Sequence, residues 1–295
     1  MTYFDETNAV EETNDLPPFN REEWIRQKRA EREQAYQMIS EQAELLPGDG
    51  ERFKSCLDLM GRFGQLSVNN ILLLECQKPD AKDLRGFDTW KDQKVSIKKG
   101  ETGIMLFEAG KQYTRRDGTT ATAYNVKRVF DVSQTDLPFA VSPIVRRDGH
   151  MLIRALVKYA PCRFEGAEAS KLPRGRVAVY DQAANTVLAL PGAGDDDLFR
   201  EMALAVAYAH LSKSEYNGPA KDTIAVCAAY VLCVRNGIDT ADFDFSKQPE
   251  TLKDMDETQI KAVLAKIRLV ANTISQDMEK HFEKLKEVPS RDDAR

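Results

Sequence analysis

Aromatic and basic residues are interleaved between residues 87 and 130. The aromatic members are Phe87, Trp90, Phe107, Tyr113, Tyr124 and Phe130, and the basic members are Lys91, Lys94, Lys98, Lys99, Arg115, Arg116, Lys127 and Arg128. Proteins hold unpaired nucleic-acid strands with this combination, because bases stack on aromatic faces at about 1–3 kcal/mol each while cations neutralise phosphates. The segment therefore indicates a surface for single-stranded nucleic acid.

Individual residues are assigned to two roles on this surface. We predict base stacking by Trp90, Tyr113 and Tyr124. We predict phosphate contacts by Lys94, Lys98, Lys99, Arg115, Lys127 and Arg128. Tyr124 and Arg128 are four residues apart, so one strand face would carry both. The structural alternative is that Phe107, Phe130 and Trp90 are core residues, as most such aromatics are.

The distribution of charge supports a local patch rather than a basic protein. The chain of 295 residues has a net charge of −5, which is not the balance of a typical nucleic-acid-binding domain. Residues 78–130 nevertheless contain twelve bases and seven acids, whereas residues 1–19 contain five acids and no base. A basic middle in an acidic chain is a candidate contact for an anionic partner. The alternative is a solvated face of mixed charge.

Few residues are equipped for catalysis. The three histidines, His150, His210 and His281, are not spaced to chelate a metal, and no HExxH, GxxxxGK[ST] or GxSxG motif is present. The five cysteines include no CxxC pair, which suits a reducing cytoplasm. No apolar run reaches the roughly 18 residues of a membrane span. We therefore expect a cytoplasmic protein without membrane contact, catalytic residue, metal or other cofactor.

Periodicity and breakers predict the elements that position these residues. In the front half we expect helices at 22–45, 51–63 and 67–77, then strands at 95–97, 102–108 and 121–132, with Asp117 and Gly118 in a hairpin turn. In the rear half we expect a helix at 148–159, strands at 176–180 and 186–190, and helices at 196–212, 221–236 and 257–286. The predicted class is α+β: N-terminal helices with a small antiparallel sheet, followed by a mostly helical domain with a β-hairpin.

The domain organisation follows from the same signals. Residues 1–19 are predicted as a disordered acidic tail, because they are polar and end at Pro17 and Pro18. The first domain covers 20–135, a linker covers 131–143, the second domain covers 144–245, and 246–295 hold the long C-terminal helix.

Several short motifs occur in a fixed order in the front half. They are SVNNILLL (67–74), QKP (77–79), GFDTW (86–90), IKKGETGI (97–104), YNVK (124–127), VFD (129–131) and SQT (133–135). Residues 20–135 thereby resemble the N-terminal single-stranded-DNA-binding domain of the antirestriction ArdC family, and are most similar to its LtrC-like members on integrative and conjugative elements. The resemblance implies sequence-independent binding of single-stranded DNA, which shields incoming DNA during transfer.

The rear half resembles the second domain of that family, which is a zincin-like metallopeptidase. The match runs through LFR (198–200) into AVAYA (205–209). In the family, this helix carries His-Glu-x-x-His, in which two histidines hold zinc and the glutamate acts as base. Leu204, Ala205 and Tyr208 occupy those positions here. The resemblance therefore implies a degenerate, metal-free zincin-like domain that is a scaffold or the surface for a protein partner.

Two other functions remain open from the sequence. One is a peptidase with an atypical metal site that uses His150 or His210, and a stoichiometric metal would favour it. The other is a protein-interaction module without a DNA role, in which the acidic tail and the C-terminal helix contact a partner. Salt dependence separates this module from a DNA-binding protein, because binding to phosphates weakens steeply as salt rises.

Overall fold

The computed structural model describes residues 20–137, 147–218, 220–246 and 248–287. The acidic tail predicted at 1–19 and residues 138–143 of the predicted linker lie outside these ranges. The front half contains α1 (Arg21–Leu45), α2 (Gly50–Arg62), α3 (Val68–Gln77), β1 (Leu84–Arg85), α4 (Phe87–Asp92), β2 (Ile104–Thr114) and β3 (Thr120–Asp131). The rear half contains α5 (Gly149–Lys158), β4 (Arg163–Gly166), β5 (Ala178–Asp181), β6 (Thr186–Ala189), α6 (Asp195–Lys213), α7 (Lys221–Asn236) and α8 (Glu257–Glu287).

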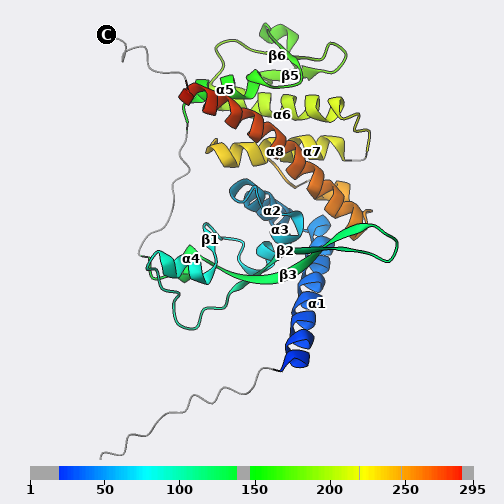
Figure 1. Cartoon of the computed structure of the whole chain (residues 1–295). Helices are drawn as coiled ribbons and strands as arrows, with labels where there is room; N and C mark the ends of the chain where they lie inside the picture. Colours follow the sequence, from blue (N-terminus) through cyan, green and yellow to red (C-terminus); the bar gives the residue numbers. More distant parts are fainter. Residues whose placement is uncertain (1–19, 138–146, 219, 247, 288–295) are drawn as a thin grey trace, which may run out of the picture.

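The two halves are stacked in layers (Figure 1). The β2–β3 ribbon crosses α1, and α2 and α3 lie between this ribbon and α7. Helix α6 then separates α7 from a second small sheet, while α8 runs diagonally across the layers. The first sheet has the order β1-β3-β2 and is antiparallel. The second has the order β4-β6-β5, with β4 parallel and β5 antiparallel to β6. The α+β class is confirmed.

Most predicted elements are present within three residues at each end, apart from β2, which continues six residues beyond the predicted strand to Thr114. The predicted strand at 95–97 is wrong, because this segment forms only an isolated bridge from Ile97 to Thr135. Helix α4 and strands β1 and β4 were not predicted, since two to six residues show no measurable periodicity. The Asp117 and Gly118 turn is confirmed: Gly118 has a φ of 83° and donates to the carbonyl of Arg115 over 3.0 Å.

A continuous core joins the halves. Its buried members extend from Ala35 on α1 to Phe282 on α8, and α7 is buried on nearly every side, as its apolar sequence predicts. Helix α2 packs directly on α7, where Gly61 permits the close approach: a Cβ at this position would lie 2.4 Å from a methyl group of Val234. Packing between the halves therefore contributes to the stability of both.

Side chains from α7 and α8 also cap the carboxyl end of α2. Arg235 donates to the carbonyl oxygen of Met60 over 3.0 Å, and Asn272 donates to that of Gly64 over 3.0 Å. Arg268 reaches the carbonyl of Gln65 over 3.3 Å. Met60 is in the last turn of α2, whose final carbonyls have no partner within the helix, and Gly64 and Gln65 belong to the turn that follows.

The outer edge of β2 is covered by two amide side chains of α3. Asn70 accepts from the backbone N–H of Phe107 over 2.7 Å and donates to its carbonyl over 2.9 Å. Gln77 contacts both backbone groups of Met105 in the same way, over 2.9 and 3.0 Å. The two amides replace a neighbouring strand, so this stretch of β2 has no bare edge open to pairing with another chain.

Asp131 ties the segment before β1 to the end of β3. Its carboxylate accepts from the backbone N–H groups of Lys82, Asp83 and Ser133 over 2.6, 3.0 and 2.9 Å. Gln134 completes a capping box by accepting from the Asp131 N–H. Because Asp131, Gln134 and Thr135 are buried, this part of the predicted linker belongs to the folded domain. Burial opposes the charge of Asp131, but the hydrogen bonds outweigh it and hold the pKa of this carboxyl below its ordinary value.

Asp131→Asn is expected to lower the free energy of unfolding by about 2 kcal/mol at pH 7. The amide oxygen accepts hydrogen bonds less strongly than a carboxylate oxygen, and the amide NH2 group would face backbone N–H groups, which are also donors. A depressed pKa stabilises the fold above the unfolded pKa, and the benefit is lost as pH falls through the folded pKa. The difference between Asp131→Asn and the parent should therefore shrink below about pH 4. Urea unfolding at several pH values measures it, with Asp92→Asn on exposed α4 as control. An unchanged difference down to pH 2.5 would contradict this account.

Candidate nucleic-acid interface

The predicted phosphate ligands lie along the β2–β3 ribbon and the turns at its ends. Strand β3 has 12 residues and is about 36 Å long at roughly 3.3 Å per residue. Helix α4 lies at one end of the ribbon and the hairpin turn at the other (Figure 1). Lys94, Lys98 and Lys99 follow α4, whereas Arg115 lies in the hairpin turn. The structure thus places these four cations at opposite ends of one ribbon.

The cations at the two ends are exposed and unneutralised. Within the described ranges, Lys94, Lys99 and Arg115 have no ion pair, and Lys98 donates only to the carbonyl oxygen of Ser133, over 2.9 Å. The neighbours Lys91, Lys111 and Arg116 are exposed and unpaired as well. Cations without a carboxylate partner can contact phosphates without first breaking an internal pair.

The two predicted phosphate ligands in the middle of the ribbon are already engaged. Lys127 is paired with Glu108 on the neighbouring strand over 2.9 Å. Arg128 donates to the carbonyl oxygen of Gly103 over 3.0 Å and lies 3.9 Å from a carboxylate oxygen of Glu31. Both side chains are less available to a phosphate than the cations at the ends.

The prediction that Trp90 stacks on a base is corrected by its environment. Only 1% of this side chain is exposed, and it forms a small core with Val95 and Val132. Its indole N–H donates to the carbonyl of Phe130 over 3.0 Å, and the guanidinium of Arg85 covers the ring at 4.7 Å. No face of the ring is open to a nucleobase.

The two predicted stacking tyrosines are exposed but lie on different faces of the ribbon. Tyr113 is 51% exposed and Tyr124 is 45% exposed. Tyr113 is directly opposite Ala121, three residues from Tyr124 along β3. An odd separation on a strand puts side chains on opposite faces, so the two rings cannot line one surface. Arg128 shares the face of Tyr124, as predicted, while Lys127 lies on the other.

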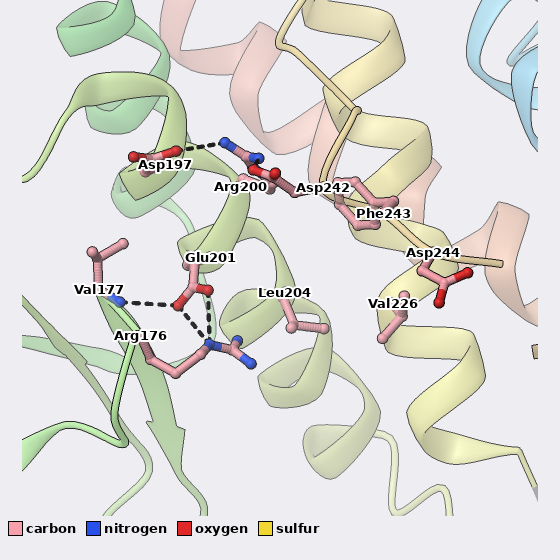
Figure 2. Close-up of a pocket in the computed structure, with 11 residues that line it drawn as sticks. Arg176, Val177, Asp197, Arg200, Glu201, Leu204, Val226, Asp242, Phe243 and Asp244 are labelled. Carbon is pink, nitrogen blue, oxygen red and sulfur yellow. Dashed lines mark hydrogen bonds and ion pairs between the residues drawn. The ribbon is translucent and has the colours of Figure 1, made fainter. Parts of the chain in front are cut away.

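A cleft in the rear half lies beside α6, on the helix where the zincin-like resemblance places the active-site motif (Figure 2). It has a volume of about 470 Å³ and is lined by α6, the residues before β5, α7 and the segment 242–244. Glu201 holds this wall together: it pairs with Arg176 over 2.7 Å and accepts from the backbone N–H groups of Val177 and Ala178 over 3.1 and 3.2 Å. Arg200 bridges Asp197 and Asp242 at the rim.

The residues at the three His-Glu-x-x-His positions line this cleft and the groove next to it, and they do not fit a zinc centre. Leu204 and Ala205 have no donor atom, and Leu204 faces Val226 across the cleft (Figure 2). Tyr208 donates to a carboxylate oxygen of Asp222 over 3.0 Å, and burial together with that hydrogen bond raises its pKa to about 12, so it keeps its proton at neutral pH. Among residues 20–137, 147–218, 220–246 and 248–287, no three His, Cys, Asp or Glu side chains are grouped to hold a metal.

The two histidines considered for an atypical metal site lie in two different environments. His150 lies 3.4 Å from Asp195 and is largely exposed. His210 lines a separate groove between α6 and α8, where burial lowers its pKa.

Known proteins are similar to this chain in structure. No protein-family model matches the chain, and no curated protein does. A metal-free crystal structure of the antirestriction protein ArdC from the R388 plasmid is similar over 73% of this chain and 85% of its own, with a TM-score of 0.52 and 15% identity. Its Mn(II)-bound structure is similar over 72% and 88%, with a TM-score of 0.50 and 15% identity.

The chain has the ArdC fold. The resemblance predicted from the motifs of the front half is thereby confirmed for the fold, and the similarity covers 73% of the chain. One of the two ArdC structures contains Mn(II). In the present chain, Leu204 in the cleft beside α6 and Ala205 in the groove next to it have no donor atom for a metal ion.

One exposed aromatic residue beside the ribbon was not among the predicted site residues. Tyr36 of α1 is 46% exposed, and its ring centroid lies 4.8 Å from that of Phe107 on β2. Its position within a helix of many charged residues gave it no distinguishing pattern. Only the crossing of α1 over the ribbon brings it to the surface that carries Tyr124.

Proposed function

We propose that the chain binds single-stranded DNA without sequence preference, and that it serves as an anti-restriction protein that shields transferred DNA of a mobile element in the cytoplasm. The observation that carries the proposal is the pair of exposed, unneutralised cation groups at the two ends of a ribbon about 36 Å long. That length corresponds to about ten nucleotides at a stacked spacing of roughly 3.4 Å. It also lies within the 4–16 nucleotides that compact single-strand-binding folds cover.

The ArdC fold supports the biological part of this proposal, because the neighbour with this fold is an antirestriction protein. Exposed rings beside the cations support the preference for unpaired strands. Stacking requires open base faces, which a duplex does not offer. Among the helices of the described ranges, none has both the length and the hydropathy needed to cross a membrane.

The test is a fluorescence-anisotropy titration of the full chain with a labelled 20-nucleotide single strand and with the corresponding duplex, at two salt concentrations. We expect tighter binding to the single strand and a linear fall of log K with log salt, with a slope of about −0.7 per phosphate contacted. Equal affinity for a mixed sequence and for oligothymidine supports the lack of sequence preference. Absence of binding at low salt would favour a protein-interaction module without a DNA role.

For the rear half we propose a scaffold without peptidase activity, which provides the surface for a protein partner. The alternative is a metallopeptidase with an atypical site. Because Leu204 and Ala205 lack donor atoms, we expect that the chain dialysed against Zn(II) or Mn(II), and then against buffer alone, retains a substoichiometric amount of either metal by plasma mass spectrometry. One tightly held ion per chain together with cleavage of a peptide would establish the alternative.

A further inference from the structure

Three aromatic rings form a row where α1 crosses the ribbon. Phe107 is the central ring and is 8% exposed. Its centroid lies 4.8 Å from that of Tyr36 and 6.2 Å from that of Tyr124. The two outer tyrosines are 46% and 45% exposed. The row therefore presents two open rings, one from a helix and one from a strand, on a common buried support.

The register explains why Phe107 and Tyr124 share a surface. Tyr124 is directly opposite Ala109, which is two residues from Phe107, so the two rings are diagonal neighbours on one face of the ribbon. Tyr36 packs on Phe107 from α1, on the same face. Packing against the buried Phe107 ring restrains both tyrosine side chains before a ligand binds. This reduces the conformational entropy that the side chains lose when a ligand stacks on them.

Cations flank the row on both sides. Arg32 lies one helical turn before Tyr36, and its Nε is buried without a hydrogen-bond partner among the described residues. Lys111 lies in the bulge of β2 between Ala109 and Gln112, exposed and unpaired within the described ranges. On α1, Glu33 is paired with Arg29 over 2.8 Å, and Glu31 is paired with Lys28 over 2.8 Å and lies 3.9 Å from Arg128. The surroundings of the two rings therefore favour an anionic ligand.

We infer that Tyr36 and Tyr124 form a base-stacking site, which holds two nucleobases of a single strand against the row at the crossing of α1 and the ribbon. The inference rests on the proposed function and assigns to it a site that includes α1. The cations at the ends of the ribbon contact phosphates, whereas this row contacts bases. Because every base has an aromatic face, the site is tolerant of sequence.

The experiment compares Tyr36→Leu and Tyr124→Leu with the parent on two oligonucleotides, a 20-mer of thymidine and a 20-mer whose central residues are abasic. We expect each variant to bind the thymidine strand about five- to fifty-fold more weakly than the parent. On the abasic strand each variant should bind as the parent does, because the bases that the rings would contact are absent. Tyr36→Phe keeps the ring and should retain the parent affinity on both strands.

The control is Tyr180→Leu, which removes a half-buried tyrosine from the rear sheet and should leave both affinities unchanged. Parent-like binding of the thymidine strand by Tyr36→Leu and Tyr124→Leu would overturn the stacking site and leave the proposed function standing. An equal loss on the abasic strand would also overturn it, since the rings would then act only through the fold. Failure of the parent to bind either strand would overturn both proposals.

Discussion

Lys98→Glu combined with Lys99→Glu is expected to weaken single-stranded DNA binding by about 30- to 100-fold at low salt. The two lysines are exposed, and neither has a carboxylate partner within the described ranges. Reversal removes two phosphate contacts and introduces two repulsive charges at the same end of the ribbon. The slope of log K against log salt should become shallower by about 1.4, which is 0.7 for each lost contact. Anisotropy titration at four salt concentrations measures both quantities.

A matched control separates a local contact from the change in net charge. Lys158→Glu combined with Lys171→Glu makes the same change of charge at two exposed positions of the rear half. We expect its affinity to fall less than threefold, because layers of helices separate this part of the rear half from the ribbon (Figure 1), and salt screens exposed charges beyond a Debye length of roughly 10 Å. Equal losses for the two double variants would show that overall charge, and not this end of the ribbon, governs binding.

The second large effect concerns stability. Asn70→Asp is expected to lower the free energy of unfolding by about 3 kcal/mol at pH 7. The Asn70 side chain is 7% exposed, and its amide nitrogen donates to the carbonyl of Phe107. A carboxylate there cannot donate, so it would place a buried charge against a carbonyl oxygen. Urea unfolding measures the loss.

The pH dependence of this variant identifies the cause. Burial beside a carbonyl should raise the pKa of the new carboxyl, and its protonated form can donate as the amide does. A raised folded pKa means that the loss is complete above that pKa and declines as pH falls below it. Asn69→Asp is the control, because its carboxylate lies in the first turn of α3, where the helix dipole favours it. A loss in Asn70→Asp that is the same at pH 4 and pH 8 would contradict the edge contact.

The main elements of the fold follow from local signals in the sequence. The caps at Ser67 and Gly237, the turn at Gly118 and the apolar run of α7 are each set by residues adjacent in the chain. The amide contacts from Asn70 and Gln77 to β2 could not be predicted, because they join residues 28 to 37 positions apart. Asparagine near a helix start indicates capping first, and pairing with a strand edge depends on tertiary packing.

The sequence pattern locates the aromatic and basic residues of the candidate interface, but it does not show which of them are buried or on which face each lies. Interleaved aromatic and basic residues indicate a composition but do not say which rings are buried. Trp90 has the side chain best suited to stacking, and the same large apolar surface places it in a core. The bulge between Ala109 and Gln112 shifts the register and puts Tyr113 and Tyr124 on opposite faces. Regular alternation of side chains along β2 would have put them on the same face.

In the rear half, the absence of donors at Leu204 and Ala205 could be read directly from the sequence. The role of Glu201 could not be predicted from the sequence, because its carboxylate accepts hydrogen bonds from backbone N–H groups 23 and 24 residues away. It joins α6 to the residues before β5 and thereby shapes one wall of the cleft. A partly buried ion pair with such backbone contacts is expected of a structural residue.

The most direct test of the account is a photocrosslinking footprint on the full chain. A single strand with photoreactive thymines is bound at low salt, irradiated and mapped by mass spectrometry of the digested protein. We predict crosslinks to peptides that contain Tyr36, Tyr124 and the segments 94–99 and 111–116, and their loss when unlabelled single strand competes. Crosslinks confined to the cleft beside α6, or none above the level of a duplex, would contradict a single-strand interface on the front half.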